Sequence, residues 1–298
     1  MPPVDRMRAV IDLQRRLQGL GYIADRPLAA TLMLMDDLRR PLLLEGEAGA
    51  GKTEIAKVLA QLHSTECVRL QCYEGLDVHA ALYEWNYQRQ LLAIRLLEHD
   101  ERSVEAKEED IFSERYLLKR PLLDSITREH PVVLLIDEVD RADEAFEAYL
   151  LELLSDFQLS IPELGTIKAR TRPWVVLTSN GTRELSDALR RRCLYHYVEY
   201  PSFEKELLIV ETKVPEAPAQ LSRQLVEFVQ SLRQVDLQRK PGIAETLDWA
   251  AALLRLDIAS LDDATPEAIL DTLTTLLKTK NDRAALTPDV VQRMVAAC

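Results

Sequence analysis

The chain has 298 residues, 47% of them hydrophobic, and a formal net charge of -12. This composition is typical of a folded protein with one large or two modest domains, and it excludes a disordered chain. The acidic excess disfavours general binding to nucleic acid, because such binding needs a Lys/Arg-rich surface that displaces counterions. The four cysteines form no C-x-x-C pair and no His lies at zinc-ligand spacing from them, so we expect reduced thiols.

The N-terminal segment 1–6 lacks the charged-then-apolar layout of a secretory signal. No apolar stretch approaches the roughly 20 residues that a membrane span needs. We therefore expect a cytoplasmic protein without a membrane partner.

Two helices are predicted before the first strand. Apolar residues recur at helical spacing from Val4 to Leu20, where Gly19 and Gly21 end the pattern. A second helix is predicted from Pro27, which suits the first helical position, to Arg40.

The next segment, from Gly46 to Thr53, fits the pattern G-x-x-x-x-G-K-[ST] in full. It lies between an apolar run, 42–44, predicted as a buried strand, and a predicted helix, 53–62, whose N-terminal amides would receive phosphates. Lys52 is expected to contact the β- and γ-phosphates, and Thr53 to ligate Mg²⁺. The pattern predicts a site for ATP and Mg²⁺ formed by Gly46, Glu47, Ala48, Gly49, Ala50, Gly51, Lys52, Thr53 and Glu54.

Three further segments are predicted as strands: 67–71, 131–136 and 173–178. The second of them is apolar at every position, as expected for a central strand that is covered on both faces. A helix is predicted over 142–156 and a hairpin over 157–170. Strands that alternate with helices predict the α/β class, a doubly wound parallel sheet with its ligand at the carboxyl ends of the strands.

The chain after residue 200 lacks the β-branched apolar density of strands. We predict a boundary there, between a nucleotide-binding α/β domain of residues 1–200 and a helical domain of residues 201–298. The predicted helices of the second domain cover about 203–213, 217–235, 243–257, 265–279 and 287–297.

Acidic and amide side chains follow two of the predicted strands. Asp137 is expected to hold Mg²⁺ through water, and Glu138 to orient or deprotonate the attacking water. Asn180 ends the neighbouring strand, where its amide would position the same water or touch the γ-phosphate, unless it is simply a turn residue. Three arginines, 190–192, end a short helix. One of them is a candidate to stabilise transition-state charge in a neighbouring subunit, and the alternative is that they complement the helix dipole.

The order of these motifs resembles that of an AAA+ ATPase over nearly the whole chain. Residues 137–142, Asp-Glu-Val-Asp-Arg-Ala, resemble the D-E-[IV]-[ND]-R-A segment of the MoxR branch, and residues 177–180 resemble its sensor 1. The segments 41–53, 170–180 and 240–249 are similar to the CoxD-type proteins linked with molybdenum-containing carbon monoxide dehydrogenases.

The resemblance implies a function. MoxR-branch proteins are ring-shaped, often hexameric ATPases that commonly act as chaperones with a partner that bears a von Willebrand factor A domain. It therefore implies ATP-driven remodelling of a protein client, in metal-centre maturation of a molybdenum hydroxylase such as carbon monoxide dehydrogenase.

The resemblance also assigns residue roles. It gives Arg192 the place of the arginine finger, although Arg191 stands where the family has an acidic residue, so the finger can be shifted by one position. It places Tyr22 and Ile23 against the adenine base, unless Ile23 is simply a core residue. Many relatives have Ser-Pro-Arg at the start of a lid helix where this chain has residues 244–246, Ala-Glu-Thr, so sensor 2 stays unassigned. Arg239 and Lys240 are the alternatives for that role.

Two competing functions stay open at this point. The first is a P-loop NTPase that loads or moves nucleic acid, which the net charge disfavours. The second is a nucleotide-gated scaffold with little turnover. The joint presence of Lys52, Asp137, Glu138 and Asn180 disfavours the scaffold, because these are the residue types that hydrolysis requires.

Overall fold

The computed structural model describes residues 3–96, 102–162 and 164–298; the first two residues of the segment assessed for a signal sequence lie outside them. The chain divides into two compact units. One comprises the chain up to Ala29 together with Gly46–Lys52 and Val198–Cys298, and the other comprises Ala30–Glu45 and Thr53–Tyr197. The division into domains of residues 1–200 and 201–298 stays a prediction.

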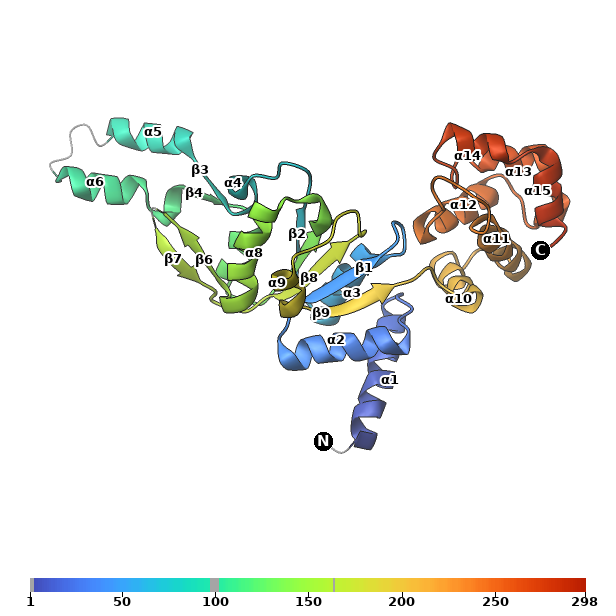
Figure 1. Cartoon of the computed structure of the whole chain (residues 1–298), viewed down its shortest axis with the longest axis horizontal. Helices are drawn as coiled ribbons and strands as arrows, with labels where there is room; N and C mark the ends of the chain where they lie inside the picture. The colour runs from blue at the N-terminus through green and yellow to red at the C-terminus, as the bar shows by residue number, and fades with distance from the viewer. Residues whose placement is uncertain (1–2, 97–101, 163) are drawn as a thin grey trace. The chain divides into compact units, whose positions relative to one another are not determined.

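A five-stranded sheet lies at the centre of the second unit (Figure 1), in the order β2-β5-β8-β1-β9. The pairs β2·β5, β5·β8 and β8·β1 are parallel, and their register brings Gln71 beside Asp137. The strands are β1 Leu42–Gly46, β2 Cys67–Gln71, β5 Val133–Asp137, β8 Trp174–Ser179 and β9 Leu194–Val198. The predicted α/β class with a helical C-terminal region is confirmed. The edge strand β9 was not predicted, because its exposed tyrosines give it little apolar density.

The central strands are buried on both faces. Leu134 and Ile136 of β5 join a large apolar cluster on one face, together with Leu177 of β8. Val133 and Leu135 alternate with them, so they point to the opposite face, and both are fully buried. This double cover explains why β5 is a continuous apolar run in the sequence.

The helices predicted over 4–20, 27–40, 53–62 and 142–156 are present in the α/β part, with end points that differ by no more than two residues, whereas the helices over 78–81, 104–111 and 121–127 were not predicted. A short hairpin follows α8, as predicted. The helices are α1 Pro3–Gly19, α2 Arg26–Leu38, α3 Lys52–Leu62, α4 Val78–Ala81, α5 Tyr87–Leu96, α6 Val104–Ile111, α7 Pro121–Thr127, α8 Glu144–Asp156 and α9 Asp187–Arg192. The short strands are β3 Tyr83–Trp85 with β4 Leu117–Lys119, and β6 Gln158–Ile161 with β7 Gly165–Lys168.

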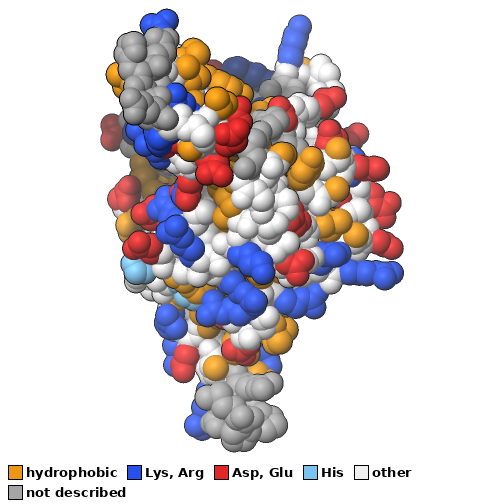
Figure 2. Space-filling model, turned by 90° about the vertical axis from the view of Figure 1, so that its left-hand side faces the viewer, with side chains coloured by type: hydrophobic (Ala, Val, Ile, Leu, Met, Phe, Trp, Pro, Cys, Tyr) orange, Lys and Arg blue, Asp and Glu red, His pale blue; other side chains and the backbone are white. Residues whose placement is uncertain are grey.

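An insertion between β2 and β5 exposes apolar side chains. The helices α5 and α6 project from the end of the β3·β4 pair (Figure 1). Leu91 is 62% exposed and Leu96 is 75% exposed, whereas Gln90 and Ala93 are buried. Figure 2 faces this end of the structure and shows hydrophobic side chains among charged ones at the surface. The helix α5 is thus attached by a narrow buried edge, and most of its apolar residues face solvent.

The C-terminal helical region has its own core. Phe228 and Trp249 are fully buried and pack against each other, and the indole N–H of Trp249 donates to Thr272 Oγ1 at 2.8 Å. The predicted helix over 265–279 ends early, at Thr272, and α14 was missed because it has only six residues. The helices are α10 Phe203–Lys213, α11 Ala219–Leu232, α12 Ile243–Arg255, α13 Pro266–Thr272, α14 Lys280–Ala285 and α15 Pro288–Val295.

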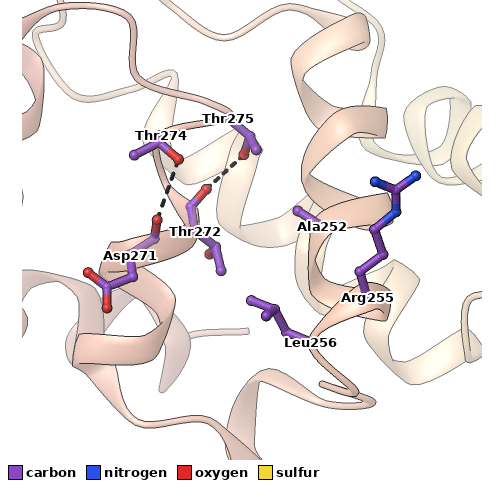
Figure 3. A pocket seen from close by; sticks show the side chains of 7 residues that line it. All are labelled: Ala252, Arg255, Leu256, Asp271, Thr272, Thr274 and Thr275. Atoms are coloured by element: carbon purple, nitrogen blue, oxygen red, sulfur yellow. Dashed lines mark hydrogen bonds between the residues drawn. The ribbon is translucent and has the colours of Figure 1, made fainter.

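A surface pocket lies within this helical region (Figure 3). Residues at the end of α12, the following Leu256 and residues of the segment 271–275 line it, among them Arg255 and Asp271. It contains none of the residues predicted to bind a nucleotide. Among the described residues, no helix combines the length and the hydropathy that crossing a membrane requires.

Candidate active site

The P-loop connects β1 to α3, as its sequence predicts. Gly49 and Gly51 have φ angles of +79° and +90°, a region that L side chains rarely adopt. A Cβ atom at Gly46 would lie 2.1 Å from the carbonyl oxygen of Val198, so this position also requires glycine. Lys52 is buried, and its ammonium donates to the carbonyl oxygens of Gly46 at 2.6 Å and Glu47 at 2.8 Å. The loop therefore already holds the lysine over its own backbone.

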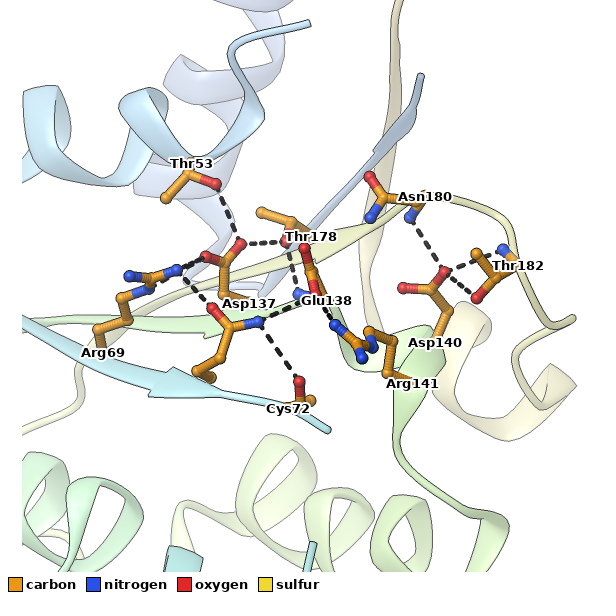
Figure 4. Close-up of polar contacts among 11 residues, drawn as sticks. Thr53, Arg69, Cys72, Asp137, Glu138, Asp140, Arg141, Thr178, Asn180 and Thr182 are labelled. Carbon is orange, nitrogen blue, oxygen red and sulfur yellow. Dashed lines mark hydrogen bonds and ion pairs between the residues drawn. The ribbon is translucent and has the colours of Figure 1, made fainter. Parts of the chain in front are cut away.

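Asp137, at the carboxyl end of β5, is buried and fully hydrogen-bonded (Figure 4). Its Oδ1 accepts from Thr53 Oγ1 at 3.1 Å and from Thr178 Oγ1 at 2.6 Å. Its Oδ2 accepts from the guanidinium of Arg69 on β2, with the Nε atom at 3.0 Å. The structure thus brings together the two predicted magnesium ligands, Thr53 and Asp137.

Glu138 lies one residue further, at the rim of the sheet. Its φ and ψ angles of 55° and 50° are left-handed, which is uncommon for a residue other than glycine. Its N–H donates to Thr178 Oγ1 at 2.8 Å, and its Oε2 accepts from Gln71 Nε2 at 3.1 Å and Arg141 Nη1 at 3.0 Å. The left-handed backbone turns this carboxylate away from the path of β5, toward Gln71 and Arg141.

Asp140 connects the end of β5 to the end of β8, a role that was not predicted from the sequence. Its Oδ2 accepts from the backbone N–H groups of Asn180 at 3.2 Å and Thr182 at 2.9 Å, and from the Thr182 hydroxyl at 2.7 Å (Figure 4). Its Oδ1 is buried without a hydrogen-bond partner in the described part of the chain. Asp140 thereby fixes the backbone from which the Asn180 side chain projects.

The three arginines of α9 differ in their partners. Arg190 pairs with Glu45 at 3.2 Å, and Arg191 is 82% exposed with Asp187 at 3.9 Å. Arg192 donates to Ser155 Oγ and, at 2.9 Å, to the carbonyl oxygen of Ala188. Within the described residues, Arg192 is the one of the three without a carboxylate partner.

The remaining predicted residues lie at less defined positions. Tyr22 and Ile23 are half-buried directly after α1, and the Tyr22 N–H donates to Leu17 O at 2.9 Å. They belong to the same compact unit as the P-loop. Glu54 lies in the first turn of α3, where its carboxylate pairs with Lys57 at 3.1 Å near the surface.

The donor atoms fit Mg²⁺ better than a transition metal. Thr53 and Asp137 offer hard oxygen ligands, and Mg²⁺ is usually held by one or two carboxylates together with water and substrate phosphates. Among the described residues, no group of three or more His, Cys, Asp or Glu side chains forms a metal cage. Burial and the nearby carboxylates, Asp137 among them, raise the pKa of the Cys72 thiol to about 12.

Residues 41–193, which include the P-loop, β5, β8 and the arginine cluster, match the family of AAA domains described as the dynein-related subfamily, AAA_5. The chain belongs to this family. Relatives of this AAA_5 chain include an uncharacterized protein of Staphylococcus epidermidis, 25% identical over 247 residues that cover 79% of this chain and 85% of the relative. An uncharacterized protein of Staphylococcus aureus is 26% identical over 251 residues, 80% of this chain and 86% of the relative.

Solved structures of Thermotoga maritima RuvB are similar to this AAA_5 chain at 15% identity. A variant of that protein gives a TM-score of 0.49 and covers 89% of this chain and 69% of the RuvB chain. The structure described as a Holliday junction branch migration motor gives 0.42, with 92% and 69% covered.

Several residues of the site escaped the sequence analysis. Arg69, Gln71 and Thr178 reach Asp137 or Glu138 from the neighbouring strands β2 and β8. The available signal was their position at or near the carboxyl ends of predicted strands, where ligand-binding residues gather in α/β sheets.

Proposed function

We propose that this protein is an ATP-hydrolysing AAA+ remodelling ATPase of MoxR type. The observation that supports this most directly is the contact between Thr53 and Asp137, at 3.1 Å. It joins the first turn after the P-loop to the acidic end of β5. Membership of the AAA_5 family supports the same function.

The residues of the P-loop are proposed to bind the triphosphate. Lys52 satisfies its ammonium with two backbone carbonyls. A bound triphosphate offers stronger, charged acceptors, so Lys52 would exchange its neutral partners for the β- and γ-phosphate oxygens. Thr53 and Asp137 would hold Mg²⁺, which supplies charge neutralisation on the phosphate oxygens.

Glu138 is proposed to take the proton from the attacking water. Its carboxylate is held by one amide donor, Gln71, and one guanidinium donor, Arg141. A partly exposed side chain can change rotamer at little cost, so Glu138 can leave these donors for a water molecule. Asn180, fixed through Asp140, is proposed to position the same water.

Arg192 is proposed as the residue that completes the active site of an adjacent subunit in a homo-oligomeric ring. Its guanidinium is oriented by two neutral acceptors, Ser155 and Ala188, and no carboxylate of the described residues neutralises it. Arg190 and Arg191 each have such a partner. An arginine without a matching carboxylate is better suited to meet the phosphate charge of a neighbouring site.

The client is proposed to be a protein, with a von Willebrand factor A domain protein as partner and metal-centre maturation of a molybdenum hydroxylase as the process. This finer role is supported by the sequences of residues 137–142, which resemble the MoxR branch, and 240–249, which resemble CoxD-type proteins. The net charge of -12 disfavours nucleic acid as the client.

Steady-state hydrolysis of ATP by the purified chain tests the proposed activity. We expect Mg²⁺-dependent release of phosphate that is lost on chelation of the metal. A second experiment distinguishes a protein client from a nucleic-acid client. The rate of ATP hydrolysis is measured with added DNA or RNA at rising salt concentration. A stimulation that falls steeply with salt would favour the nucleic-acid function instead.

A further inference from the structure

The backbone of the C-terminal helical region touches the P-loop within one compact unit. The N–H of Ile243 donates to the carbonyl oxygen of Gly49 at 3.0 Å. Gly242 and Gly49 approach so closely that a Cβ on Gly242 would lie 2.6 Å from both the Cα and the oxygen of Gly49. Real Cβ atoms essentially never come this near to backbone, so this contact requires that Gly242 has no side chain.

Backbone conformation does not explain the glycine at 242. Its φ and ψ angles are -90° and -174°, an extended conformation that any residue adopts. Gly242 begins α12, and its N–H donates to Glu245 Oε2 at 3.1 Å. The restriction at this position therefore comes from the P-loop and not from the helix that Gly242 starts.

A buried ion pair holds the segment before Gly242 in place. Arg233 and Glu206 are almost completely buried and form two hydrogen bonds, at 2.6 and 2.7 Å. The Nε atom of Arg233 donates to the carbonyl oxygen of Pro241 at 2.8 Å. Thr246 Oγ1 lies 2.9 Å from Glu206 Oε1 and 3.0 Å from the Gly242 carbonyl oxygen, so it can donate to either. The Pro241–Gly242 backbone is thus anchored by charged side chains from α10 and the end of α11.

The same arginine connects to the P-loop through a tyrosine. The guanidinium of Arg233 lies 4.9 Å from the ring centroid of Tyr200, and the Tyr200 hydroxyl donates to Ala48 O at 3.1 Å. Two consecutive P-loop residues, Ala48 and Gly49, therefore accept hydrogen bonds from one anchored network.

We infer that Gly242 is a positioning residue for nucleotide binding, because the lack of a side chain lets the anchored backbone of residues 241–243 fix the P-loop peptide at Gly49. This inference rests on the proposed ATP-binding function. The helical region would then act on the phosphate-binding loop through backbone contacts. The first turn of α12 contains no arginine that could contact the phosphates directly. Because the coupling is reciprocal, a nucleotide that is bound more tightly through this contact also strengthens the contact.

The test compares Gly242→Ala with the wild type and with Gly19→Ala. Gly19 is the matched control, since it lies in the same compact unit and a Cβ there would meet nothing within 4 Å. Titration with a non-hydrolysable ATP analogue should show affinity lowered about tenfold for Gly242→Ala, within the usual range of coupling between sites. The Gly19→Ala affinity should stay within about twofold of the wild type.

Amide exchange provides a second measurement that a merely structural role would not change. In the wild type, the analogue should slow exchange of the Ile243 amide by a factor close to the affinity lost in Gly242→Ala, because linkage makes the two factors equal. Slow exchange of the buried Trp249 indole N–H, which donates to Thr272 Oγ1, checks that the helical region of the variant is folded. Tyr200→Phe, which keeps the ring and removes one hydrogen bond to Ala48, should weaken binding by about threefold.

The two levels of the proposal fail differently. A wild type that binds no analogue would overturn the proposed ATP-binding function and this inference with it. The positioning role alone would be overturned by three results together. The wild type binds the analogue, Gly242→Ala binds it with equal affinity, and the analogue does not change the exchange rate of the Ile243 amide. If Gly242→Ala does not fold, unchanged affinity in Tyr200→Phe together with an unresponsive Ile243 amide would overturn the positioning role as well.

Discussion

The P-loop and the acidic end of β5 are stabilised by different means. The loop depends on backbone: three glycines with positive φ, carbonyl acceptors for Lys52, and a peptide contact with Gly242. The acidic end of β5 depends on side-chain charge, as Arg69 holds Asp137 and Arg141 holds Glu138. The loop should therefore be sensitive to added volume, and the acidic end of β5 to lost charge or a lost donor.

The largest expected effect concerns Arg192, whose positive charge is proposed to complete the active site of an adjacent subunit. Arg192→Ala should lower ATP hydrolysis by about three to five powers of ten, as the loss of an arginine finger does in GTPases, with little change in ATP affinity. Arg191→Ala is the matched control, because this neighbour on α9 already has a carboxylate partner. A large loss in Arg191→Ala alone would move the role to that residue.

Mixing experiments extend this prediction. An Arg192→Ala subunit keeps its own P-loop, and a Glu138→Gln subunit keeps its arginine, so mixed rings should regain part of the activity. Mixed rings that are demonstrated by mass analysis and still inactive would show that Arg192 acts within its own subunit.

The next largest effect tests the acidic side of the comparison directly. Glu138→Gln keeps the shape of the side chain and removes its basicity, so hydrolysis should fall by about 10²- to 10⁴-fold while ATP still binds. Single-turnover hydrolysis and equilibrium titration separate the two quantities. Loss of binding equal to that of a P-loop variant would mean that Glu138 supports the phosphates and not the water.

A third prediction concerns the charged group of the loop. Lys52→Ala should weaken ATP binding by about 100-fold, because charge-assisted hydrogen bonds contribute up to about 3 kcal/mol each. Lys57→Ala, a largely exposed lysine further along α3, should change affinity by less than about twofold. Calorimetric titration checks both. Equal affinity of Lys52→Ala and the wild type would contradict the assigned role.

The smallest expected effect tests whether the hydrogen bond from Gln71 merely restrains the Glu138 side chain or orients it for the reaction. Gln71→Ala removes the amide that donates to its carboxylate at 3.1 Å, which should leave the Glu138 side chain freer to turn toward the attacking water. The turnover number should rise about threefold, the equivalent of one hydrogen bond, with ATP affinity unchanged. Gln61→Ala on the exposed side of α3 serves as control. A fall in turnover would show that Gln71 orients Glu138 for the reaction.

The sequence predicted the strand β5, the P-loop and the contact partners Thr53 and Asp137, because a contiguous motif and a wholly apolar strand define them locally. The contacts of Arg69 and Gln71 with Asp137 and Glu138 could not be predicted, since they depend on the register that brings β2 beside β5. The same holds for Gly242, whose importance comes from a contact with Gly49, far earlier in the chain. Residues whose role depends on a contact with a neighbouring strand or a distant segment can be recognised only once the fold is known.

The left-handed backbone at Glu138 has a consequence for the balance between stability and activity. At a φ of 55°, a side chain with a Cβ costs about 1–2 kcal/mol relative to glycine. A glycine at this position would relieve the strain and remove the carboxylate. Selection for stability alone would therefore favour an inactive protein at this position. A glutamate there is what we expect of a residue retained for chemistry against the preference of its own backbone.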